Sequence, residues 1–407
     1  MKKITTLLFF TLLVHFSAFA QTQSQFDKML SKINEDSIRK TMQDLQNFSN
    51  RFCAHSVEGN RPVAGYLVQR LRNYGIANAV IDSFHYEGYS GWVGAINRNF
   101  YNVKGRIEGS SRRDTTYIIG AHLDAIAYDF NSWPFLTATA PGADDNASGC
   151  AVMIEIARIF HLYNITPKYH IEFMAWDAEE LGLLGAAYDA HRRGLNNEWN
   201  VFVLNNDMVA TQPKDLPYTL NLHWYDNSIF LRDKAAEICL RYTSITPYIP
   251  EGIENDMRER SDSWVYNQYG YQGIFHIEHY FSEVYHSEND ILDMCNVDFT
   301  KEVAKLNFAM LYHYNVTDIF DLDDSPAELT VSVYPIPVVN KLFIASFNDQ
   351  LLIEKVELFD IQGRLLNSLT VSFDEIVELP MHEVQKGFYI VRIVTNRKIF
   401  TRKVIKQ

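Results

Sequence analysis

The chain has 407 residues, of which 47% are hydrophobic and 14% aromatic, enough for a large buried core and for more than one domain. Its formal net charge is −13. Residues 1–20 and residues 335–407 carry +2 each, so the segment between them carries −17, and a nucleic-acid partner is not expected for it.

Residues 1–20, MKKITTLLFFTLLVHFSAFA, have the pattern of a cleaved secretory signal peptide. Two lysines precede an apolar run, which ends in a small-residue Ala-Phe-Ala site. No later stretch is long and apolar enough to cross a membrane. The first cysteine, Cys53, lies far from the signal, so no lipid-attachment cysteine follows the cleavage site. We therefore expect a mature protein that begins near Gln21 and leaves the cytoplasm.

Helical spacing of apolar residues predicts one leading helix over residues 21–46 and a second amphipathic helix over residues 61–74. Residues 76–84 and 102–107 then have patterns typical of strands.

Three short apolar runs each lead into an acidic or imidazole residue. They are residues 116–124 (TYIIGAHLD), 171–180 (IEFMAWDAEE) and 201–207 (VFVLNND), separated by helical patterns at residues 147–163 and 181–193. Such runs are typical of buried parallel strands. The alternation predicts an α/β domain with a mostly parallel sheet and helices on both faces.

Residues 141–148 (PGADDNAS) contain two adjacent carboxylates, Asp144 and Asp145, between a Pro-Gly turn and the first turn of a helix. This arrangement is costly unless a cation binds there. Open α/β sheets bind ligands at the carboxyl ends of their strands. We therefore expect five side chains to converge at that edge: His122, Asp145, Glu179, Glu180 and Asp207.

The second half of this domain has weaker patterns. Residues 212–262 are rich in tyrosine, tryptophan and charge, and we interpret them as the region that shapes a substrate pocket. A helix-like stretch, a strand, a polar loop (VYHSEND) and a closing amphipathic helix follow, at residues 264–267, 273–278, 284–290 and 299–314.

The converging side chains are of the types that bind zinc. Zinc accepts imidazole and carboxylate ligands, and two zinc ions about 3.5 to 4 Å apart can share a bridging carboxylate. Two ions then need at least five protein ligands, a number that His286 of the polar loop completes. We assign His122 and Asp207 to one ion and Glu180 and His286 to the other, with Asp145 as the bridge.

Two further carboxylates have different predicted roles. Glu179 stands beside a ligand but remains free to act as general base. Asp124 is placed to accept the second ring proton of His122 and so to fix its tautomer. A single acidic residue at a strand end is more often a helix cap or a solvated loop residue, and a single histidine such as His286 is more often a surface residue. The hypothesis therefore depends on the whole set.

Five segments in this order resemble the zinc aminopeptidase family M28, of the bacterial leucyl aminopeptidase type: GAHLDAI, PGADDNASG, WDAEELGLLGA, NNDMVA and YHSEND. The resemblance covers about residues 30–315. It implies a three-layer α/β/α sandwich and a site for two zinc ions, with Asp145 as the bridge, Glu179 as the base and the ligand partition given above. It also implies a strained cis peptide between Asp145 and Asn146.

The chain departs from this family in one place. Some relatives carry a tyrosine that steadies the tetrahedral intermediate, two residues before an SDH-like segment. Here SDS, at residues 261–263, follows MRER, so Arg258 or Arg260 stands near that position. An arginine could serve an oxyanion or bind a substrate carboxylate, and a surface pair with Asp256 or Glu259 is the alternative.

Residues 321–328 (DLDDSPAE) form an acidic, proline-containing linker, which would separate a peptidase domain of residues 21–320 from a second domain. Six short β-type runs follow: residues 330–334, 341–346, 355–359, 364–371, 388–393 and 398–405. This spacing predicts a small all-β sandwich over residues 329–407.

The segments YPIPVVNKLFI, VELFDIQGRLL and KGFYIVRI, with the basic tail FTRKVIKQ, are similar to the type IX secretion sorting domain of Bacteroidetes. The resemblance implies a domain that addresses the protein, exported through the periplasm, to the outer-membrane exporter and is then removed. An ordinary carbohydrate-binding or adhesion sandwich is the alternative.

These expectations describe a secreted or cell-surface dizinc aminopeptidase that removes N-terminal residues from peptides. A hydroxide bridging the two ions, formed with the help of Glu179, would attack the peptide carbonyl, and Glu179 would return the proton to the leaving amine. One alternative is a glutaminyl cyclase-like enzyme with a single zinc, which the presence of both His122 and Asp207 disfavours. The other is a surface-binding protein with an inactive peptidase fold, which the intact ligands and base disfavour.

Overall fold

The computed structural model describes residues 24–90, 93–111, 114–128, 134–198, 200–316, 331–334, 338, 340–346, 352–374, 376–397 and 399–406. The predicted signal peptide and acidic linker lie outside these residues. The chain forms two compact units, which divide close to residue 320. Among the described helices, none combines the length and the hydrophobicity that a membrane span requires.

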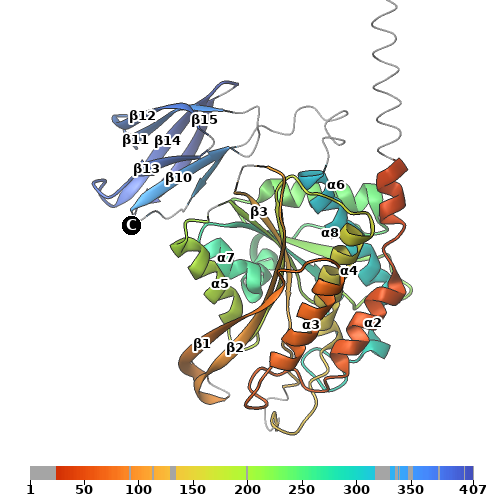
Figure 1. The fold of residues 1–407 in the computed structure, drawn as a ribbon. Coiled ribbons are helices and arrows are strands. Elements are labelled where there is room, and N and C mark those ends of the chain that lie inside the picture. The colour runs from red at the N-terminus through yellow and green to blue at the C-terminus, as the bar shows by residue number, and fades with distance from the viewer. Residues whose placement is uncertain are drawn as a thin grey trace, which may run out of the picture. The chain divides into compact units, whose positions relative to one another are not determined.

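An eight-stranded sheet forms the middle layer of the first unit, in the order β1-β2-β4-β3-β5-β8-β6-β7 (Figure 1). Its centre consists of four neighbouring parallel strands: β4 (His170–Trp176), β3 (Thr116–His122), β5 (Val201–Asn206) and β8 (Gln272–Glu278). Every residue of β3, β5 and β8 is buried, which explains their continuous apolar runs. The register pairs His122 with Trp176, so β3 and β4 end at the same level.

Further strands flank the central four: β1 (Val80–Ser90) and β2 (Gly94–Ile107) beside β4, and β6 (Thr219–Trp224) and β7 (Thr246–Tyr248) beyond β8. The strand predicted at residues 76–84 begins four residues before β1 and stops six residues before its end, and the one predicted at residues 102–107 misses the first eight residues of β2. Most β1 residues are exposed or half-buried, so the apolar alternation is weak there. Residues 212–262, for which no clear periodicity was seen, also contain β6, β7 and helix α6 (Ile229–Tyr242).

Helices cover both faces of this sheet (Figure 1). One face carries α3 (Arg61–Asn73), α4 (Gly149–Leu162), α6 and α8 (Val297–Asn315), with α2 (Glu35–Gln46) packed on α4 and α8. The other face carries α5 (Leu184–Leu195) and α7 (Asp262–Gln268). The predicted three-layer α/β/α sandwich with a mostly parallel mixed sheet is confirmed.

The predicted leading helix is interrupted. Residues 24–30 are helical, and α2 begins only after Asn34, whose side chain accepts the backbone N–H of Ser37 at 3.2 Å. The N–H of Asn34 donates to the carboxylate of Glu155 in α4 at 2.7 Å, so a tertiary contact replaces a helical hydrogen bond. Asparagine is a favoured N-cap residue, and here it begins α2.

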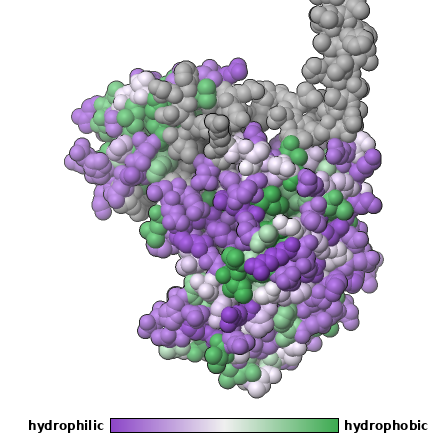
Figure 2. All heavy atoms as spheres, viewed as in Figure 1, coloured by the Kyte–Doolittle hydropathy of each residue, from purple (hydrophilic) through white to green (hydrophobic). Residues whose placement is uncertain are grey.

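Hydrophilic residues prevail on the face of the molecule drawn in Figure 2, where hydrophobic residues lie in small separate patches. The interior is apolar: Ile118, Ile119, Val203 and Leu204 of β3 and β5 are completely buried. Such burial contributes about 25 cal/mol per Å² of apolar surface, so the strands that carry the candidate residues are anchored in the core.

The second unit consists of two antiparallel sheets around one apolar core. The first contains β13 (Ile376–Pro380), β10 (Lys341–Ser346) and β9 (Val331–Tyr334), in that order. The second contains β12 (Leu365–Asp374), β11 (Ile353–Asp360), β14 (Gly387–Thr395) and β15 (Ile399–Lys406). Ile344 and Leu379 of the first sheet and Val356 and Val391 of the second share the core. The predicted small β-sandwich is therefore observed, with β13 as an additional strand.

Candidate metal centre

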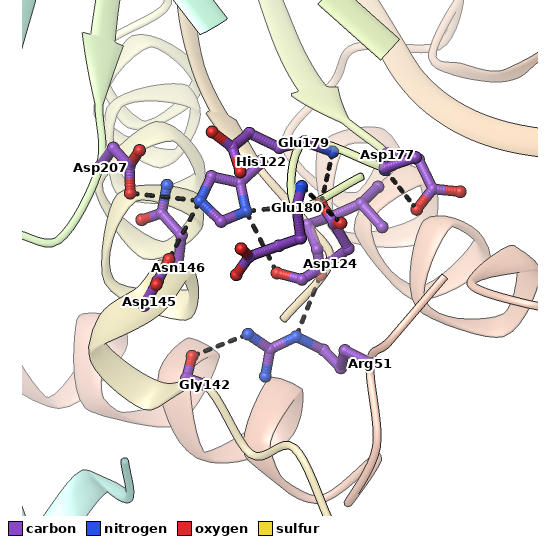
Figure 3. A network of polar contacts seen from close by, with 12 residues as sticks. Arg51, His122, Asp124, Gly142, Asp145, Asn146, Asp177, Glu179, Glu180 and Asp207 are labelled. Atoms are coloured by element: carbon purple, nitrogen blue, oxygen red, sulfur yellow. Dashed lines mark hydrogen bonds and ion pairs between the residues drawn. The ribbon is translucent and has the colours of Figure 1, made fainter. Parts of the chain in front are cut away.

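Neighbouring strands deliver the candidate side chains to one edge of the sheet. His122 is the last residue of β3, Glu179 and Glu180 lie in the turn after β4, and Asp207 directly follows β5. Asp145 comes from the turn η1 (Ala143–Ser148), between β3 and α4. Figure 3 shows these side chains gathered around His122. The convergence expected from the strand ends is therefore observed.

The ligand candidates form two triplets that share Asp145. Nε2 of His122 lies 3.1 Å from Oδ1 of Asp145 and 3.2 Å from Oδ1 of Asp207. Nε2 of His286 lies 3.1 Å from Oδ2 of Asp145 and 3.1 Å from Oε2 of Glu180. The two carboxylate oxygens of Asp145 thus face two different triplets, and His286 joins the second one from the loop after β8.

The donor set fits a divalent ion such as zinc. Zinc bonds of about 2.0 to 2.2 Å in a tetrahedron place neighbouring ligand atoms roughly 3.4 Å apart. The observed separations of 3.1 and 3.2 Å are close to this value. Among the described residues, none forms a hydrogen bond with the buried Oε1 of Glu180, a costly position unless a cation lies beside it. Each triplet therefore has the chemistry and the size to hold one ion.

The site is deep and open on one side. The side chain of His122 is 1% exposed and that of Asp207 is 9% exposed, whereas that of His286 is 21% exposed. Tyr285 stacks on His286 with ring centroids 3.6 Å apart, and it is itself 39% exposed. The His286 side is therefore the accessible side of the site.

Burial and nearby charges disturb the ionisation of the cluster. Burial raises the pKa of Glu180 to about 7 and raises the pKa of Glu179 well above the usual carboxyl range. Burial acts to lower the pKa of His286, but Glu180 and Asp145 together, through their charges and hydrogen bonds, outweigh it and raise this pKa to about 10. For His122, burial is likewise outweighed by the combined effect of the surrounding carboxylates, with Asp207 first, and the pKa is raised. A divalent cation would displace the protons that these groups hold.

Asp124 contacts two parts of the site at once. Its Oδ1 lies 3.4 Å from Nδ1 of His122, and its backbone carbonyl oxygen lies 3.2 Å from the same nitrogen. The carboxylate also accepts the backbone N–H groups of Glu179, at 3.1 Å, and of Glu180, at 3.2 Å. The contact with His122 is the one the sequence suggested, whereas the support of the glutamate turn was not foreseen.

The turn that carries Asp145 is held by a residue that the sequence analysis did not single out. Asp290, in the loop after β8, accepts the backbone N–H groups of Asp144 at 2.9 Å and of Asp145 at 3.0 Å. Asp144 itself belongs to neither triplet. Its carboxylate accepts the N–H of Ala210 at 2.8 Å and the hydroxyl of Thr211 at 2.7 Å. Of the two adjacent aspartates, only Asp145 therefore faces the candidate ligands.

The same turn packs directly on the end of β5. The Asp145–Asn146 peptide bond is cis, as the family resemblance implied. The side chain of Asn146 donates to the carbonyl of Asn206 at 2.9 Å and accepts the N–H of Gly149 at 2.9 Å. A Cβ atom at Gly149 would lie 2.2 Å from the carbonyl oxygen of Asn206, so glycine alone fits this close approach.

Asp262 is a second carboxyl group that the sequence analysis missed. It is completely buried, and neither of its carboxylate oxygens has a hydrogen-bond partner among the described residues. Burial raises its pKa well above the usual range. The preceding Ser261 donates its hydroxyl to Oδ2 of Asp207 at 2.7 Å, which ties this segment to one of the triplets. Its position as the aspartate of the SDS segment, residues 261–263, was the signal that the sequence offered.

The two arginines suggested for oxyanion or carboxylate binding have other described surroundings. Arg258 donates through Nη1 to the carbonyl of Trp224 at 3.2 Å, and Tyr225 donates its hydroxyl to the carbonyl of Arg258 at 3.1 Å. Arg260 is exposed. Among the described contacts, none joins either arginine to the two triplets, whereas the hydroxyl-bearing Tyr285 stands next to a ligand candidate.

Comparison with known protein families gives two matches. The model described as "Peptidase family M28" matches residues 102–311, about half of the chain. The model described as "Secretion system C-terminal sorting domain" matches residues 332–407.

Among curated proteins, a probable zinc metalloprotease of Pyrenophora teres f. teres is 28% identical over 267 residues, which cover 61% of this chain and 55% of that protein. Leucine aminopeptidase 1 of Pyrenophora tritici-repentis is 23% identical over 303 residues, which cover 70% of this chain and 71% of that protein. The chain spans about half the length of the zinc metalloproteases that it matches.

Solved structures share the fold. The LapA aminopeptidase of Legionella pneumophila has a TM-score of 0.57 and 20% identity, with 71% of this chain and 74% of that chain covered. BSAP, a zinc aminopeptidase from Bacillus subtilis, has a TM-score of 0.56 and 15% identity, with 70% of this chain and 96% of that chain covered.

Proposed function

The chain belongs to peptidase family M28, and from this premise we propose that it is an aminopeptidase that holds two zinc ions and removes N-terminal residues from peptides. The observation that carries the proposal is the position of the two carboxylate oxygens of Asp145, which face two different triplets. An enzyme with a single zinc ion would have no use for the second triplet.

Each residue of the two triplets has a proposed place. His122 and Asp207 would hold one ion, Glu180 and His286 would hold the other, and Asp145 would be a ligand of both. When bound, the ions would polarise the scissile carbonyl and activate a water molecule. The histidines bind in their neutral form, so they give up the protons that the surrounding carboxylates otherwise favour.

Glu179 is the proposed general base. Its carboxylate lies within 4.8 Å of ligand atoms of His122 and Glu180, one from each triplet. Burial raises its pKa well above the usual carboxyl range, toward the range in which a base can both take up and release a proton. Glu179 takes a proton from the attacking water and gives it to the leaving amine. One water is thereby added across the peptide bond, and the products are a carboxylic acid and an amine. Asp124 holds the backbone of Glu179 in place through the 3.1 Å hydrogen bond.

The charge of the site favours a substrate with a free amino terminus. Two carboxyl groups besides the proposed ligands interact electrostatically with His122. Glu179 acts to raise the pKa of His122, and His122 acts to lower the pKa of Asp262, which burial raises. Two zinc ions and the three ligand carboxylates would together carry +1, so Glu179 and Asp262, once ionised in the field of the ions, would bring the site to −1 and favour a cationic ammonium group close to the scissile bond. A free α-amino group carries that charge, and an acylated one does not.

A panel of aminoacyl substrates with matched N-acylated versions tests this proposal. We expect cleavage of the free substrates alone. Equal cleavage of the acylated versions would overturn the aminopeptidase assignment and leave a zinc hydrolase. Elemental analysis of protein that has been stripped and refilled should find two zinc ions per chain. One ion at saturation would favour the cyclase-like alternative, and full zinc loading without any cleavage would favour a binding protein.

For the second unit we propose a role in export. The match of residues 332–407 to a secretion sorting domain supports delivery by a type IX secretion machinery, after passage through the periplasm, to the cell surface or the medium. Deletion of β15, the basic terminal strand, should leave the protein in the periplasm of its native host. Normal appearance of the deleted protein outside the cell would contradict this role.

A further inference from the structure

Arg51 is a completely buried cation beside the candidate metal centre. It lies outside both segments that match family models, residues 102–311 and 332–407. Figure 3 shows its side chain below Asp124, with the guanidinium directed at Gly142. We propose that Arg51 is a positioning residue that fixes the spacing of His122 and Asp145 and so sets the zinc affinity of the centre, an inference that rests on the proposed function.

The guanidinium joins the two segments that carry these ligands. Nε donates to the carbonyl of Leu123 at 3.0 Å, and Nη2 donates to the carbonyl of Gly142 at 2.7 Å. Nη1 donates to the carbonyl of Pro141. Leu123 directly follows His122, and Gly142 is the residue before the turn that contains Asp145. Because the donors of a guanidinium have a fixed planar geometry, these bonds hold the strand end and the turn at one distance.

The backbone of Arg51 is anchored to the same two segments. Its N–H donates to the carbonyl of Ala140 at 3.4 Å, and its carbonyl accepts the N–H of Ala125 at 3.2 Å. The side chain of Asn60 also donates to this carbonyl, at 2.7 Å. The residue therefore connects the chain after β3 with the chain before η1 through both its main chain and its side chain.

Gly142 provides the space that this contact requires. Its φ of +52° is one that residues with a side chain rarely adopt. A Cβ atom there would lie 2.8 Å from Nη2 of Arg51 and 2.4 Å from the Cβ of Ala125. A residue with a side chain at position 142 would therefore collide with the guanidinium of Arg51.

Arg51 also places a positive charge among acidic groups. Burial lowers its pKa, while Asp290, Asp124 and Asp145 act in the opposite direction and favour the charged form. A guanidinium remains protonated in proteins. A lysine in its place would keep the charge but would lose the planar set of donors, so substitution can separate the geometric contribution from the electrostatic one.

The test compares zinc binding and folding in the full chain carrying Arg51→Lys or Arg51→Met. Zinc affinity is measured by competition with a chromophoric chelator, and folding by thermal unfolding of the metal-free protein. We expect the affinity to fall about 10- to 100-fold in Arg51→Lys, the range typical of residues that orient metal ligands, and further in Arg51→Met. The ion held by His122 should be lost first. Its triplet contains both His122 and Asp145, whereas the other triplet contains only Asp145 of these two.

Arg193→Met is the matched control. Arg193 lies in α5, has a side-chain exposure of 1% and pairs with Glu172 and Asp189, none of which belongs to the candidate metal centre. This variant should unfold at a lower temperature and keep wild-type zinc affinity at temperatures where it is folded.

Zinc affinity within about twofold of wild type in a folded Arg51→Lys would overturn the role of Arg51 and leave it purely structural, since the expected loss is at least about tenfold. If Arg51→Met does not fold, Arg51→Lys alone decides. A failure of the proposed function has a different signature, because the wild-type protein would then bind fewer than two zinc ions or cleave no peptide.

Discussion

The backbone N–H of Glu179 donates a hydrogen bond of 3.1 Å to the carboxylate of Asp124. This bond connects the end of β3 to the turn after β4, and the second oxygen of the same carboxylate accepts the N–H of Glu180 at 3.2 Å. The proposed base and a proposed ligand are therefore positioned together by a carboxylate that is not itself a ligand candidate.

Replacing Asp124 with asparagine should reduce turnover more than zinc content. An amide group has one acceptor oxygen in place of two, so one of the two N–H groups of the glutamate turn would face an NH₂ group. We expect kcat to fall about 10- to 100-fold while two zinc ions remain bound, as for other residues that orient a metal centre. Steady-state kinetics and elemental analysis of the same preparation measure both quantities.

Asp189→Asn is the control for this variant, because Asp189 is buried and pairs with Arg193 in α5. It should lower the unfolding temperature and leave kcat unchanged. Wild-type kcat in Asp124→Asn would show that the glutamate turn holds its position without Asp124.

Glu180→Gln should lower the zinc content of the protein, whereas Glu179→Gln should leave it unchanged. Glutamine at position 179 removes the proposed base but none of the proposed ligands, so both zinc ions should stay and kcat should fall by about two to four orders of magnitude. Glutamine at position 180 removes a ligand of the triplet that contains His286, and zinc should be lost. Elemental analysis after dialysis distinguishes the two. Zinc loss in Glu179→Gln would mean that the roles of the two glutamates are exchanged.

The metal-free protein should become less stable as the pH rises from about 5 to about 9. The pKa of Glu180 is raised by burial to about 7 in the folded protein, above the value of about 4.3 in an unfolded chain. The folded state therefore binds more protons between these values, and its stability falls as the pH rises. Burial acts to lower the pKa of His286, but Glu180 and Asp145 together raise it to about 10, so His286 gives the same sign above about pH 6.5.

Zinc should remove this pH dependence, because the ions replace the protons that the cluster otherwise binds. Thermal unfolding with a chelator and with saturating zinc, at several pH values, measures the difference. The increase in Tm caused by zinc should grow with pH. A metal-free Tm that stays constant or rises between pH 5 and 9 would contradict the raised pKa values.

A truncated protein of residues 21–324 should bind zinc and cleave peptides with unchanged kinetics. All five ligand candidates and the proposed base lie in the first unit, whose core already includes the buried residues Phe308 and Leu311 of α8. Domains joined by exposed linkers usually fold separately. Kinetics and zinc content of the truncated and the full protein test this. A folded, zinc-loaded and inactive truncated protein would mean that the second unit takes part in catalysis.

The sequence by itself determined the central sheet and most of the candidate site. Continuous apolar runs mark buried parallel strands, and His122, Glu180 and Asp207 stand at the ends of three of them. Parallel strands end at a common edge, so these three side chains had to come close together once the runs were identified as neighbouring strands. This part of the fold is encoded by local patterns, and each pattern is complete within a short window of the sequence.

Apart from the contact between Asp124 and His122, only the tertiary structure decided what holds these side chains in place. Asp290 reaches the N–H of Asp145, and Arg51 reaches the carbonyl of Gly142, although each pair is far apart in the sequence. Neither Asp290 nor Arg51 differs in its local pattern from a surface residue. Their partners are backbone groups, which carry no residue-specific signal, so the contacts exist only because packing of the layers brings distant segments within hydrogen-bonding distance.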